Sequence, residues 1–413
     1  MDNKMSRRDF VKAGTSTAAL LAGAPLVYAG GQEQTISVGL IGCGGRGTGA
    51  AENCLESSQN VRLVAMGDMF KDRLDGSRRQ LSKKEGYKVN DESVFTGFDA
   101  YKKVLEAGVD MVILATPPGF RPIHFAAAIE AGKHVFFEKP VGVDPVGIRK
   151  VLEAGKKAKE KKLAVVAGTQ RRHQKSYNEA MKRIHDGAIG DIVAARCYWN
   201  GDTPWRNARK EGQTDIEYQL RNWYHHTWLC GDHIVEQHVH NLDVMNWVLQ
   251  GHPLRAVAVG GKQVRTQPEY GNGWDHFGVD FEWPNDVHVL SMCRHWPGTP
   301  GNVSEAVVGT KGKSNCATRI SGPNEWNFQG PDNKPYVQEH TDLIASIRNG
   351  NPLNEAEQVA FSTLTAIMGR EAAYTGQIIE WDKFLNSDLD LTQKVEEGGK
   401  LPPPPVWMPG KKG

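Results

Sequence analysis

Gly42, Gly44 and Gly47 form a Gly-x-Gly-x-x-Gly pattern directly after the apolar segment Ile36–Ile41. In a strand–turn–helix unit, the first glycine permits the tight turn and the second lets the backbone approach a pyrophosphate. The third lets the helix pack closely on the sheet, and the helix N-terminus offers amide donors to phosphate oxygens. Asp68 follows the next apolar segment, where a carboxylate can bond ribose hydroxyls. These residues predict a binding site for a nicotinamide dinucleotide.

The same loop indicates which nicotinamide cofactor is used. The carboxylate of Asp68 would repel a 2′-phosphate, so the sequence favours NAD over NADP. Arg46, which follows Gly45 in the loop, and Lys71 could attract that phosphate, and they leave NADP as the alternative. We expect Gly45 and Arg46 to contact the cofactor together with the spaced glycines.

Two further segments place polar groups directly after expected strands. Thr116 and Pro117 follow one apolar run, and Glu138 and Lys139 follow the next. Ligands bind outside the carboxyl ends of strands in open α/β sheets, so these residues are expected at the cofactor site. Lys139 precedes a proline and should be extended, which could hold its ammonium beside the nicotinamide. It could then polarise a substrate oxygen or exchange a proton with it, the alternative being a surface lysine in a turn.

A second group of ionisable residues lies between residues 231 and 243. At about 100° per residue, a helix over this stretch would place four ionisable side chains on one face: His233, Glu236, His240 and Asp243. His240 could take a hydroxyl proton while hydride leaves the same carbon, and Glu236 could orient the imidazole. His238 would point away from this face. We therefore expect Lys139, His240 and Glu236 to be catalytic, and His233 to contact the substrate.

The same cluster admits a metal ion as an alternative. His233, Glu236 and His240 offer nitrogen and oxygen ligands of the kind that Zn²⁺ accepts. Since His240 already has a role in proton transfer, no metal is expected. The aromatic-rich segment 200–232 is predicted to be an irregular insert that lines the substrate pocket through Tyr224 and its neighbours, because aromatic faces suit sugar C–H surfaces.

The elements that carry these residues alternate between strand and helix from residue 35 to about 165. The expected strands are short apolar runs: Ile36–Ile41, Val61–Met66, Met111–Ala115, His134–Phe137 and Leu163–Val166. Helical stretches such as Ile123–Ala131 and Val146–Glu160 lie between them. This alternation predicts an α/β fold with a doubly wound parallel sheet, that is, a Rossmann domain over 35–165.

The rhythm changes beyond residue 166. One helix is expected at Ser176–Asp186, and strands are expected at Asp191–Trp199, Arg255–Lys262, Trp274–Trp283, Val287–Arg294 and Ser304–Gly309. Helices follow at Glu339–Asn349 and Glu355–Tyr374. The pattern predicts an α/β domain over 166–380 with a large, mostly antiparallel sheet that presents one face to a partner or substrate. Residues 381–413 are expected to form a C-terminal tail.

The first 29 residues carry a different signal. Arg7 and Arg8, the apolar stretch Ala18–Val27 and the small residues before Gly30 follow the order of a twin-arginine signal peptide. We expect the translocase of that pathway to be a partner and the mature protein to be periplasmic or otherwise exported. Because the route carries folded proteins, the cofactor would be bound before export and held tightly afterwards.

The net charge of the chain argues against one class of partner, nucleic acids. The chain has a formal charge of +2, and removal of residues 1–29 takes out four basic and two acidic side chains, which leaves about zero. A neutral chain without a basic block argues against nucleic-acid binding, which depends on phosphate neutralisation.

Taken together, the glycine loop, Asp68, Thr116-Pro117-Pro118 and Glu138-Lys139-Pro140 resemble the Gfo/Idh/MocA oxidoreductase family. The resemblance covers roughly residues 35–380. It implies a Rossmann domain followed by an α/β domain whose large sheet serves oligomerisation, so a homo-oligomer is expected. It also implies NAD(P)-dependent oxidation or reduction at a carbon of a sugar or polyol. Some members of the family instead use bound NAD to hydrolyse glycosides through a transient ketone.

The resemblance also bears on single residues. His240 aligns with the catalytic histidine of the family, whereas Glu236 stands where aspartate is usual and Asp232 replaces the second glycine of a pair. By the same likeness, Arg172 and His173 reach the sugar, with plain surface polarity as the alternative.

The expected protein is an exported enzyme that acts on an unphosphorylated sugar, polyol or glycoside with tightly bound NAD. A hydrolase or lyase that works through a keto-sugar is the first alternative. A sugar-binding Rossmann protein without catalysis is the second.

Overall fold

The computed structural model describes residues 34–393, 395, 400–402 and 404–410. The expected signal peptide, residues 1–29, lies outside them. The chain divides into a unit that ends at Gln34 and a unit from Thr35 to Gly413, and only the second is described below. No helix in the described part of the chain is long and apolar enough to cross a membrane.

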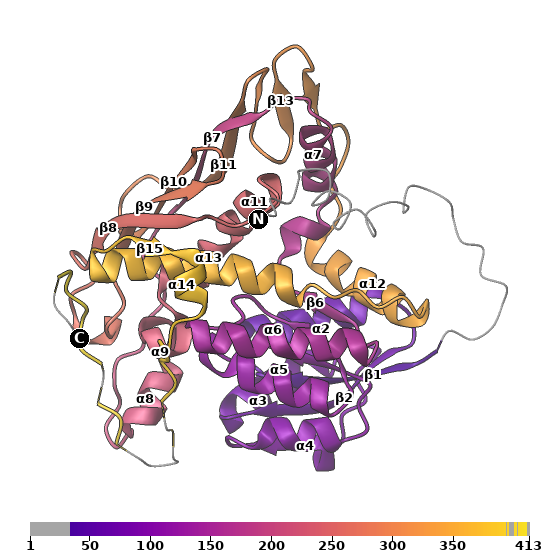
Figure 1. The fold of residues 1–413 in the computed structure, drawn as a ribbon. Helices are drawn as coiled ribbons and strands as arrows, with labels where there is room; N and C mark the ends of the chain where they lie inside the picture. The colour runs from indigo at the N-terminus through magenta and orange to yellow at the C-terminus, as the bar shows by residue number, and fades with distance from the viewer. Residues whose placement is uncertain (1–33, 394, 396–399, 403, 411–413) are drawn as a thin grey trace, which may run out of the picture. The chain divides into compact units, whose positions relative to one another are not determined.

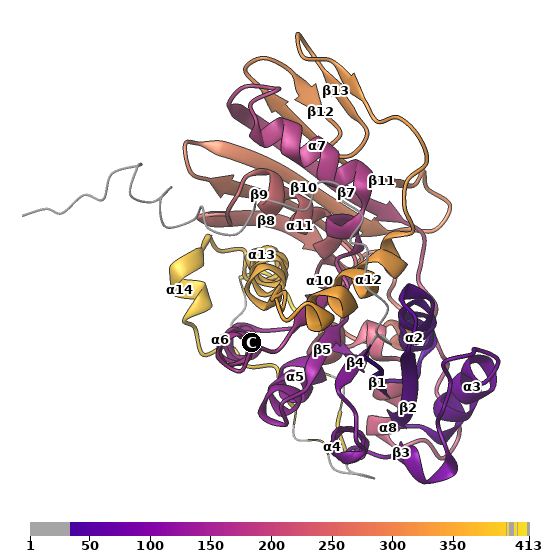
Figure 2. The same ribbon diagram turned by 90° about the vertical axis from the view of Figure 1, so that its right-hand side faces the viewer.

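The N-terminal half forms a parallel sheet in the order β3-β2-β1-β4-β5-β6, as the alternating pattern predicts; Figure 2 labels β1 to β5. Its strands are β1 (Ile36–Ile41), β2 (Val61–Asp68), β3 (Val94–Thr96), β4 (Met111–Leu114), β5 (His134–Phe137) and β6 (Val165–Ala167). β4 is buried at every residue, which is typical of a strand covered on both faces. β3 was missed, because three partly exposed residues at a sheet edge show no hydrophobic periodicity.

Helices cover both faces of this sheet, and each face has its own apolar core. One core contains residues of α2 (Gly45–Ser57), α3 (Lys71–Leu81) and α12 (Pro335–Arg348). The other contains residues of α4 (Ala100–Glu106), α5 (Arg121–Glu130), α6 (Pro145–Glu160) and α13 (Ala356–Thr375). The start of α6 shows why these helices form where they do: Asp144 caps the amide of Gly147 at 2.6 Å, and Pro145 occupies the first turn.

The second half forms a nine-stranded sheet in the order β14-β13-β12-β11-β7-β10-β9-β8-β15. Its main strands are β7 (Ile192–Gly201), β8 (Arg255–Gly261), β9 (His276–Trp283), β10 (Val287–His295) and β11 (Asn302–Gly309). The short strands are β12 (Lys313–Ser314), β13 (Arg319–Ser321), β14 (Trp326–Asn327) and β15 (Ile379–Glu380). The pairs are antiparallel except β10 with β7, so the prediction of a mostly antiparallel sheet is confirmed.

The long helix α13 lies between the two sheets, with β8 and β9 on one side and α6 on the other (Figures 1 and 2). β9 alternates strictly between buried and partly exposed residues, and its buried side chains share a core with α13. α7 (Lys175–His185) precedes β7 in the chain, and α14 (Trp381–Leu385) follows β15.

The insert is more regular than expected. Residues 200–232 contain two short helices, α8 (Asp215–Arg221) and α9 (Thr227–Cys230). Thr214 caps α8 by accepting the amide of Glu217 at 3.1 Å, and Thr-x-x-Glu is a recognised signal for a helix start.

Candidate active site

The glycine loop has the shape that a dinucleotide requires. Gly42 has φ +98°, and a Cβ there would lie 2.6 Å from the carbonyl carbon of Ala115. A Cβ on Gly47 would lie 1.9 Å from the Gly42 oxygen, so the start of α2 can approach β1 only with glycine there. By contrast, a Cβ on Gly44 would meet no atom within 4 Å. Gly44 caps α2 without a side-chain bond, which leaves the first amides of the helix available to a phosphate.

Asp68 braces this loop from the end of β2. Its Oδ2 accepts the amide of Cys43 at 2.6 Å, and its Oδ1 accepts the amide of Phe70 at 2.8 Å. Burial raises the pKa of Asp68, while these two hydrogen bonds act in the opposite direction. The structure therefore shows a role that the sequence analysis did not assign, and the bond to ribose stays a prediction.

The remaining expected cofactor residues gather at the same sheet edge. Arg46 Nε lies 2.7 Å from Glu138 Oε1, and the Arg46 guanidinium lies over the Tyr336 ring at 5.1 Å. Thr116 Oγ1 lies 3.0 Å from His124 Nδ1, and Pro117 leads into the next turn. Because Arg46 is paired with Glu138, its charge is less available to a 2′-phosphate than the sequence alone suggests.

Lys139 and Glu236 form the centre of the site. The Lys139 ammonium donates to the backbone oxygen of Glu236 and lies 3.2 Å from its Oε1. Only 10% of the Lys139 side chain and 8% of the Glu236 side chain are exposed, so the ion pair is screened little by water. Burial raises the pKa of Glu236, and the Lys139 charge lowers it. Glu236 Oε2 is buried and has no hydrogen-bond partner among the described residues, so it can still bond a ligand.

His240 lies on α11 (Val239–Val248) with its ring stacked on Trp199 at a centroid distance of 5.9 Å. Burial lowers the pKa of His240 well below its usual range, and the cations of Lys139 and Arg171 lower it further. The imidazole is therefore neutral and can accept a proton. None of the hydrogen bonds between described residues involves the His240 ring, and Glu236 is held by Lys139, so orientation of the imidazole by Glu236 stays a prediction.

The continuous helix expected over this stretch is interrupted. α10 (His233–Glu236) ends after a single turn, and the His238 amide bonds the oxygen of His233, five residues back. The His240 amide then bonds Gln237 instead of Glu236. Because the His240 amide does not bond the Glu236 carbonyl, that oxygen can accept the hydrogen bond from Lys139.

The four ionisable side chains expected on one face have different partners on the two sides of the break. His233 is buried with its Nδ1 3.2 Å from the Trp274 oxygen and 3.3 Å from Asp232 Oδ1. Asp243 accepts two hydrogen bonds from Arg172 Nε and Nη2, at 2.9 and 3.0 Å. The described residues contain no group of three or more His, Cys, Asp or Glu that could hold a metal ion. The alternative set His233, Glu236 and His240 is thus not brought together.

The expected sugar ligands make contacts within the protein. Arg172 is bound to Asp243 and lies 4.9 Å from the Trp247 ring centre. His173 lies between Asp342 and Glu355, at 2.6 and 3.3 Å. Tyr224 Oη lies 3.2 Å from His295 Nε2. With His233, these side chains support the walls of the site, and direct contact with a sugar stays a prediction.

The His238 ring faces the large sheet, since its Nε2 lies 2.7 Å from Ser291 Oγ on β10. Trp199 on β7, which stacks on the His240 ring, was missed, as was Glu305 on β11, which accepts from Arg171 and Asn241. Their strands were predicted, but which residue faces the site depends on pairing between β7 and β11, which no local pattern shows.

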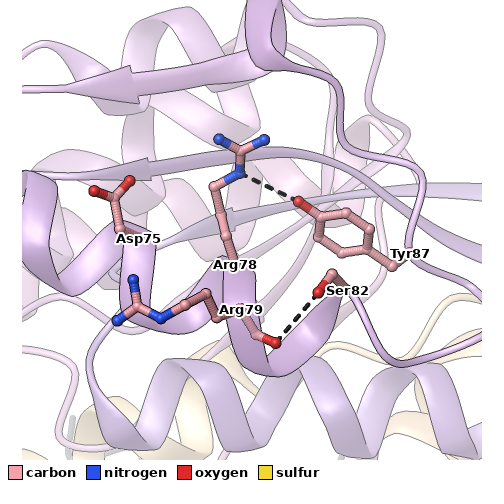
Figure 3. Close-up of a pocket in the computed structure, with 5 residues that line it drawn as sticks. All are labelled: Asp75, Arg78, Arg79, Ser82 and Tyr87. Carbon is pink, nitrogen blue, oxygen red and sulfur yellow. Dashed lines mark hydrogen bonds between the residues drawn. The ribbon is translucent and has the colours of Figure 1, made fainter.

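A surface hollow on α3 is separate from this site (Figure 3). It is lined by Asp75, Arg78, Arg79, Ser82 and Tyr87. The Arg78 guanidinium bonds Tyr87 and also Asp91, at 3.3 and 2.7 Å. Tyr87 pairs with Leu63, near the start of β2, whereas the glycine loop and Asp68 lie at the carboxyl ends of β1 and β2.

Comparison with known proteins agrees with this geometry. Residues 36–168 match a family model described as an oxidoreductase family with an NAD-binding Rossmann fold. Residues 177–314 match the Gfo/Idh/MocA C-terminal domain. Together the two matches cover more than half of the chain.

Individual relatives are more distant. The scyllo-inositol 2-dehydrogenase (NAD(+)) of Bacillus subtilis is 26% identical over 217 residues, 52% of this chain and 55% of the relative. The 2,7-anhydro-N-acetylneuraminate hydratase of Escherichia coli is 27% identical over 224 residues, with the same two coverages. The chain thus aligns with little more than half the length of these two relatives.

Among solved structures, scyllo-inositol dehydrogenase from Lactobacillus casei with bound NAD(H) and scyllo-inositol has the same fold. Its TM-score is 0.65 at 21% identity, and the match covers 84% of this chain and 99% of that one.

Proposed function

The chain belongs to the Gfo/Idh/MocA family of NAD-binding oxidoreductases, and we propose that it oxidises or reduces one carbon of an unphosphorylated sugar, polyol or glycoside. The single observation that carries this proposal is the buried Lys139–Glu236 pair with the neutral His240 nearby, at the carboxyl edge of the cofactor-binding sheet. The relative from B. subtilis, named as an inositol dehydrogenase, supports a polyol or sugar as substrate.

The residues of the chain divide the chemistry between them. NAD, held by the glycine loop, would supply the acceptor for a hydride from the substrate carbon whose hydroxyl becomes a carbonyl. Lys139 donates a hydrogen bond to that oxygen, and the neutral His240 accepts the hydroxyl proton. Glu236 holds the Lys139 ammonium by its backbone oxygen and its Oε1. In the reverse direction the same groups return the proton.

The charges around the site support an unphosphorylated substrate. Lys139 is paired with Glu236, and Arg171 is paired with Glu305. Arg46 is likewise paired with Glu138. A phosphate would have to compete with a buried carboxylate for each of these three cations, at a large electrostatic cost.

We expect NAD to dissociate slowly, because the insert and the tail cover the sheet edge beside Asp68. Arg221 of α8 bonds Asp72 twice at 3.0 Å and lies 3.9 Å from the centre of the Phe70 ring. A Cβ on Gly119 would lie 2.3 Å from the Trp228 oxygen. An apolar cluster joins these elements, with members from the sheet edge, the insert and the tail: Met69, Phe70, Phe98, Phe120, Ile216, Leu220, Trp223, Trp228, Leu229, Leu391, Val395 and Leu401.

Export is part of the same proposal. The Ser6–Lys12 motif supports passage through the twin-arginine translocase and a periplasmic or otherwise exported location. Replacement of Arg7 and Arg8 by lysine should keep the protein inside the cell. Fractionation of cells that produce the native and the twin-lysine chains tests this, and equal distribution of the two would count against it.

A hydrolase or lyase cycle is the second candidate. The unpartnered Glu236 Oε2 favours it, because burial raises the pKa of this carboxyl and a protonated carboxyl can give its proton to a leaving oxygen. The E. coli relative, named as a hydratase, points the same way. A sugar-binding protein without catalysis is disfavoured, because the Lys139–Glu236 pair is complete.

Incubation with glycosides in D₂O separates the two cycles. Oxidation and reduction alone leave the carbon next to the reacting centre unexchanged, and one sugar is oxidised for each one reduced. Deuterium at that carbon, with release of an aglycone and no net redox change, would establish the lyase or hydrolase cycle instead.

A further inference from the structure

Asp232 has a backbone conformation that residues with side chains rarely adopt. Its φ is 75° and its ψ is 166°, in a region that is populated almost only by glycine. The residue is 2% exposed, so water contributes little to its carboxylate. Glycine would adopt this conformation without strain, so the presence of aspartate calls for an interaction that only the carboxylate makes.

The Asp232 carboxylate joins three elements. Oδ1 accepts the amide of His233 at 2.6 Å, at the start of α10. Oδ2 accepts the amide of Trp274 at 2.7 Å, just before β9, and the hydroxyl of Tyr374 on α13 at 2.6 Å. Burial alone would raise the pKa of Asp232, but hydrogen bonds from His233 and Tyr374 lower it to about 2. The group is therefore a buried anion surrounded by donors.

This anchor lies one turn before Glu236. The amide of Glu236 bonds the Asp232 oxygen at 2.9 Å, so the two residues begin and end α10. A single turn has no helical stability of its own and depends on contacts at its two ends. Asp232 holds the first end, and Lys139 bonds Glu236 at the second.

Helix α13 connects the same turn to the Lys139 segment. Arg370 Nη1 donates to the Gly231 oxygen at 3.1 Å and to the Val143 oxygen at 2.8 Å. Val143 lies four residues after Lys139, and Gly231 directly precedes Asp232. Arg370 and Tyr374 are one turn apart on α13, so one rigid helix fixes both halves of the ion pair.

We propose that Asp232 is a positioning residue, which sets the carbonyl and carboxylate of Glu236 on the Lys139 ammonium through α10. The inference rests on the proposed function of that pair. This role explains why a strained aspartate occupies a position where glycine would fit. Three donors bond the Asp232 carboxylate, and no neutral side chain of that size supplies an ionised acceptor for them.

The test uses full-length Asp232→Asn and Tyr374→Phe, with Asp232→Gly in case the first variant fails to fold. Asp232→Gly removes the strain together with the carboxylate. Turnover per cofactor-loaded site should fall about tenfold to a hundredfold in both Asp232 variants, the scale of a small misplacement of a catalytic group. It should fall less in Tyr374→Phe, and KM for the sugar should change little in all three.

A second readout does not depend on turnover. Trace acylation of the folded protein, followed by peptide mass spectrometry, measures the reactivity of the Lys139 amine. Its labelling rate should rise in the Asp232 variants. Tyr87→Phe is the matched control, because it removes another tyrosine hydroxyl that bonds a charged side chain, Arg78, outside the site.

Unchanged turnover per loaded site and unchanged Lys139 labelling, with only a lower melting temperature, would show that Asp232 is merely structural and would overturn the proposal. If the native protein turns over no sugar, the proposed function fails, but the labelling comparison still decides whether Asp232 positions the pair.

Discussion

At the scale of single residues, the site consists of ion pairs with little access to water. In each pair the two charged groups are in contact and the carboxylate side chain is largely buried. The pairs are Lys139 with Glu236, Arg171 with Glu305, and Arg46 with Glu138. Breaking a buried pair by removal of one partner leaves an uncompensated charge, which is costly. Conservative replacements at these positions are therefore more informative than truncations.

Proton transfer should depend on Lys139 and His240 but not on His238. Lys139→Met and His240→Gln should each lower turnover about a hundredfold or more, the scale of a general acid or base, with cofactor content unchanged. His238→Gln is the matched control, since its ring faces Ser291 on the sheet. Steady-state kinetics on cofactor-loaded protein measures all three. Equal losses at His238 and His240 would contradict the assignment.

His173 should make stability depend on pH. Burial alone would lower its pKa, but Glu355 and Asp342 raise the pKa of His173 from 6.5 to about 10. Because the pKa of His173 is raised in the folded state, the charged imidazole stabilises the folded protein fully below about pH 6.5. This contribution is lost as the pH rises towards 10. Urea unfolding of native protein and His173→Gln should therefore differ by about 3–5 kcal/mol at pH 6 and by less at pH 9.5. A difference that grows with pH would show that His173 is neutral in the folded protein.

At the scale of elements, the sequence predicted most strands and helices, some of them almost to the residue, but not the break in the stretch from 231 to 243. The alternation of apolar runs located β1, β4 and β5 almost to the residue, because buried strands have apolar side chains on both faces. The stretch from 231 to 243 was expected to be one helix, since its periodicity is helical on both sides of the break. The Glu236 oxygen at this break accepts from Lys139, 97 residues earlier, a contact that no local pattern shows.

The cover over the cofactor edge should slow cofactor release. Arg221→Ala removes the bonds to Asp72 and the contact with Phe70, and the release rate of NADH should rise several-fold to about tenfold. Stopped-flow fluorescence with excess NAD as chase measures this rate. Arg209→Ala is the control, because Arg209 pairs with Asp215 within the insert itself. An unchanged rate in Arg221→Ala would mean that the insert does not retain the cofactor.

At the scale of the unit from Thr35 onward, one face of the large sheet exposes apolar side chains next to charged ones. Val259 is 75% exposed and Leu290 is 49% exposed, and both lie on strands adjacent to β9. The pairing places Val257 and Leu290 on either side of Asp280, so these side chains share a face. Exposed apolar patches of this kind mark protein interfaces, which supports the proposal of a homo-oligomer.

Leu290→Arg should therefore dissociate the oligomer, because a charge would be buried in an apolar interface. Light scattering coupled to size-exclusion chromatography should show a smaller particle for this variant than for the native protein. Ile123→Arg, at an exposed apolar residue of α5, should leave the mass unchanged. A native protein that already runs as a monomer would contradict the proposed assembly.

We propose that this chain retains NAD and uses it to take hydride from a sugar carbon. The most direct measurement is rapid mixing of the protein as purified, without added cofactor, with a panel of sugars and polyols, observed in the absorbance band of reduced nicotinamide. We predict a rise that approaches one equivalent per chain, slower with a substrate deuterated at the reacting carbon and about a hundredfold or more slower in Lys139→Met. A native protein that contains no nicotinamide cofactor and binds none, or one that binds a sugar with no change in that band, would contradict it.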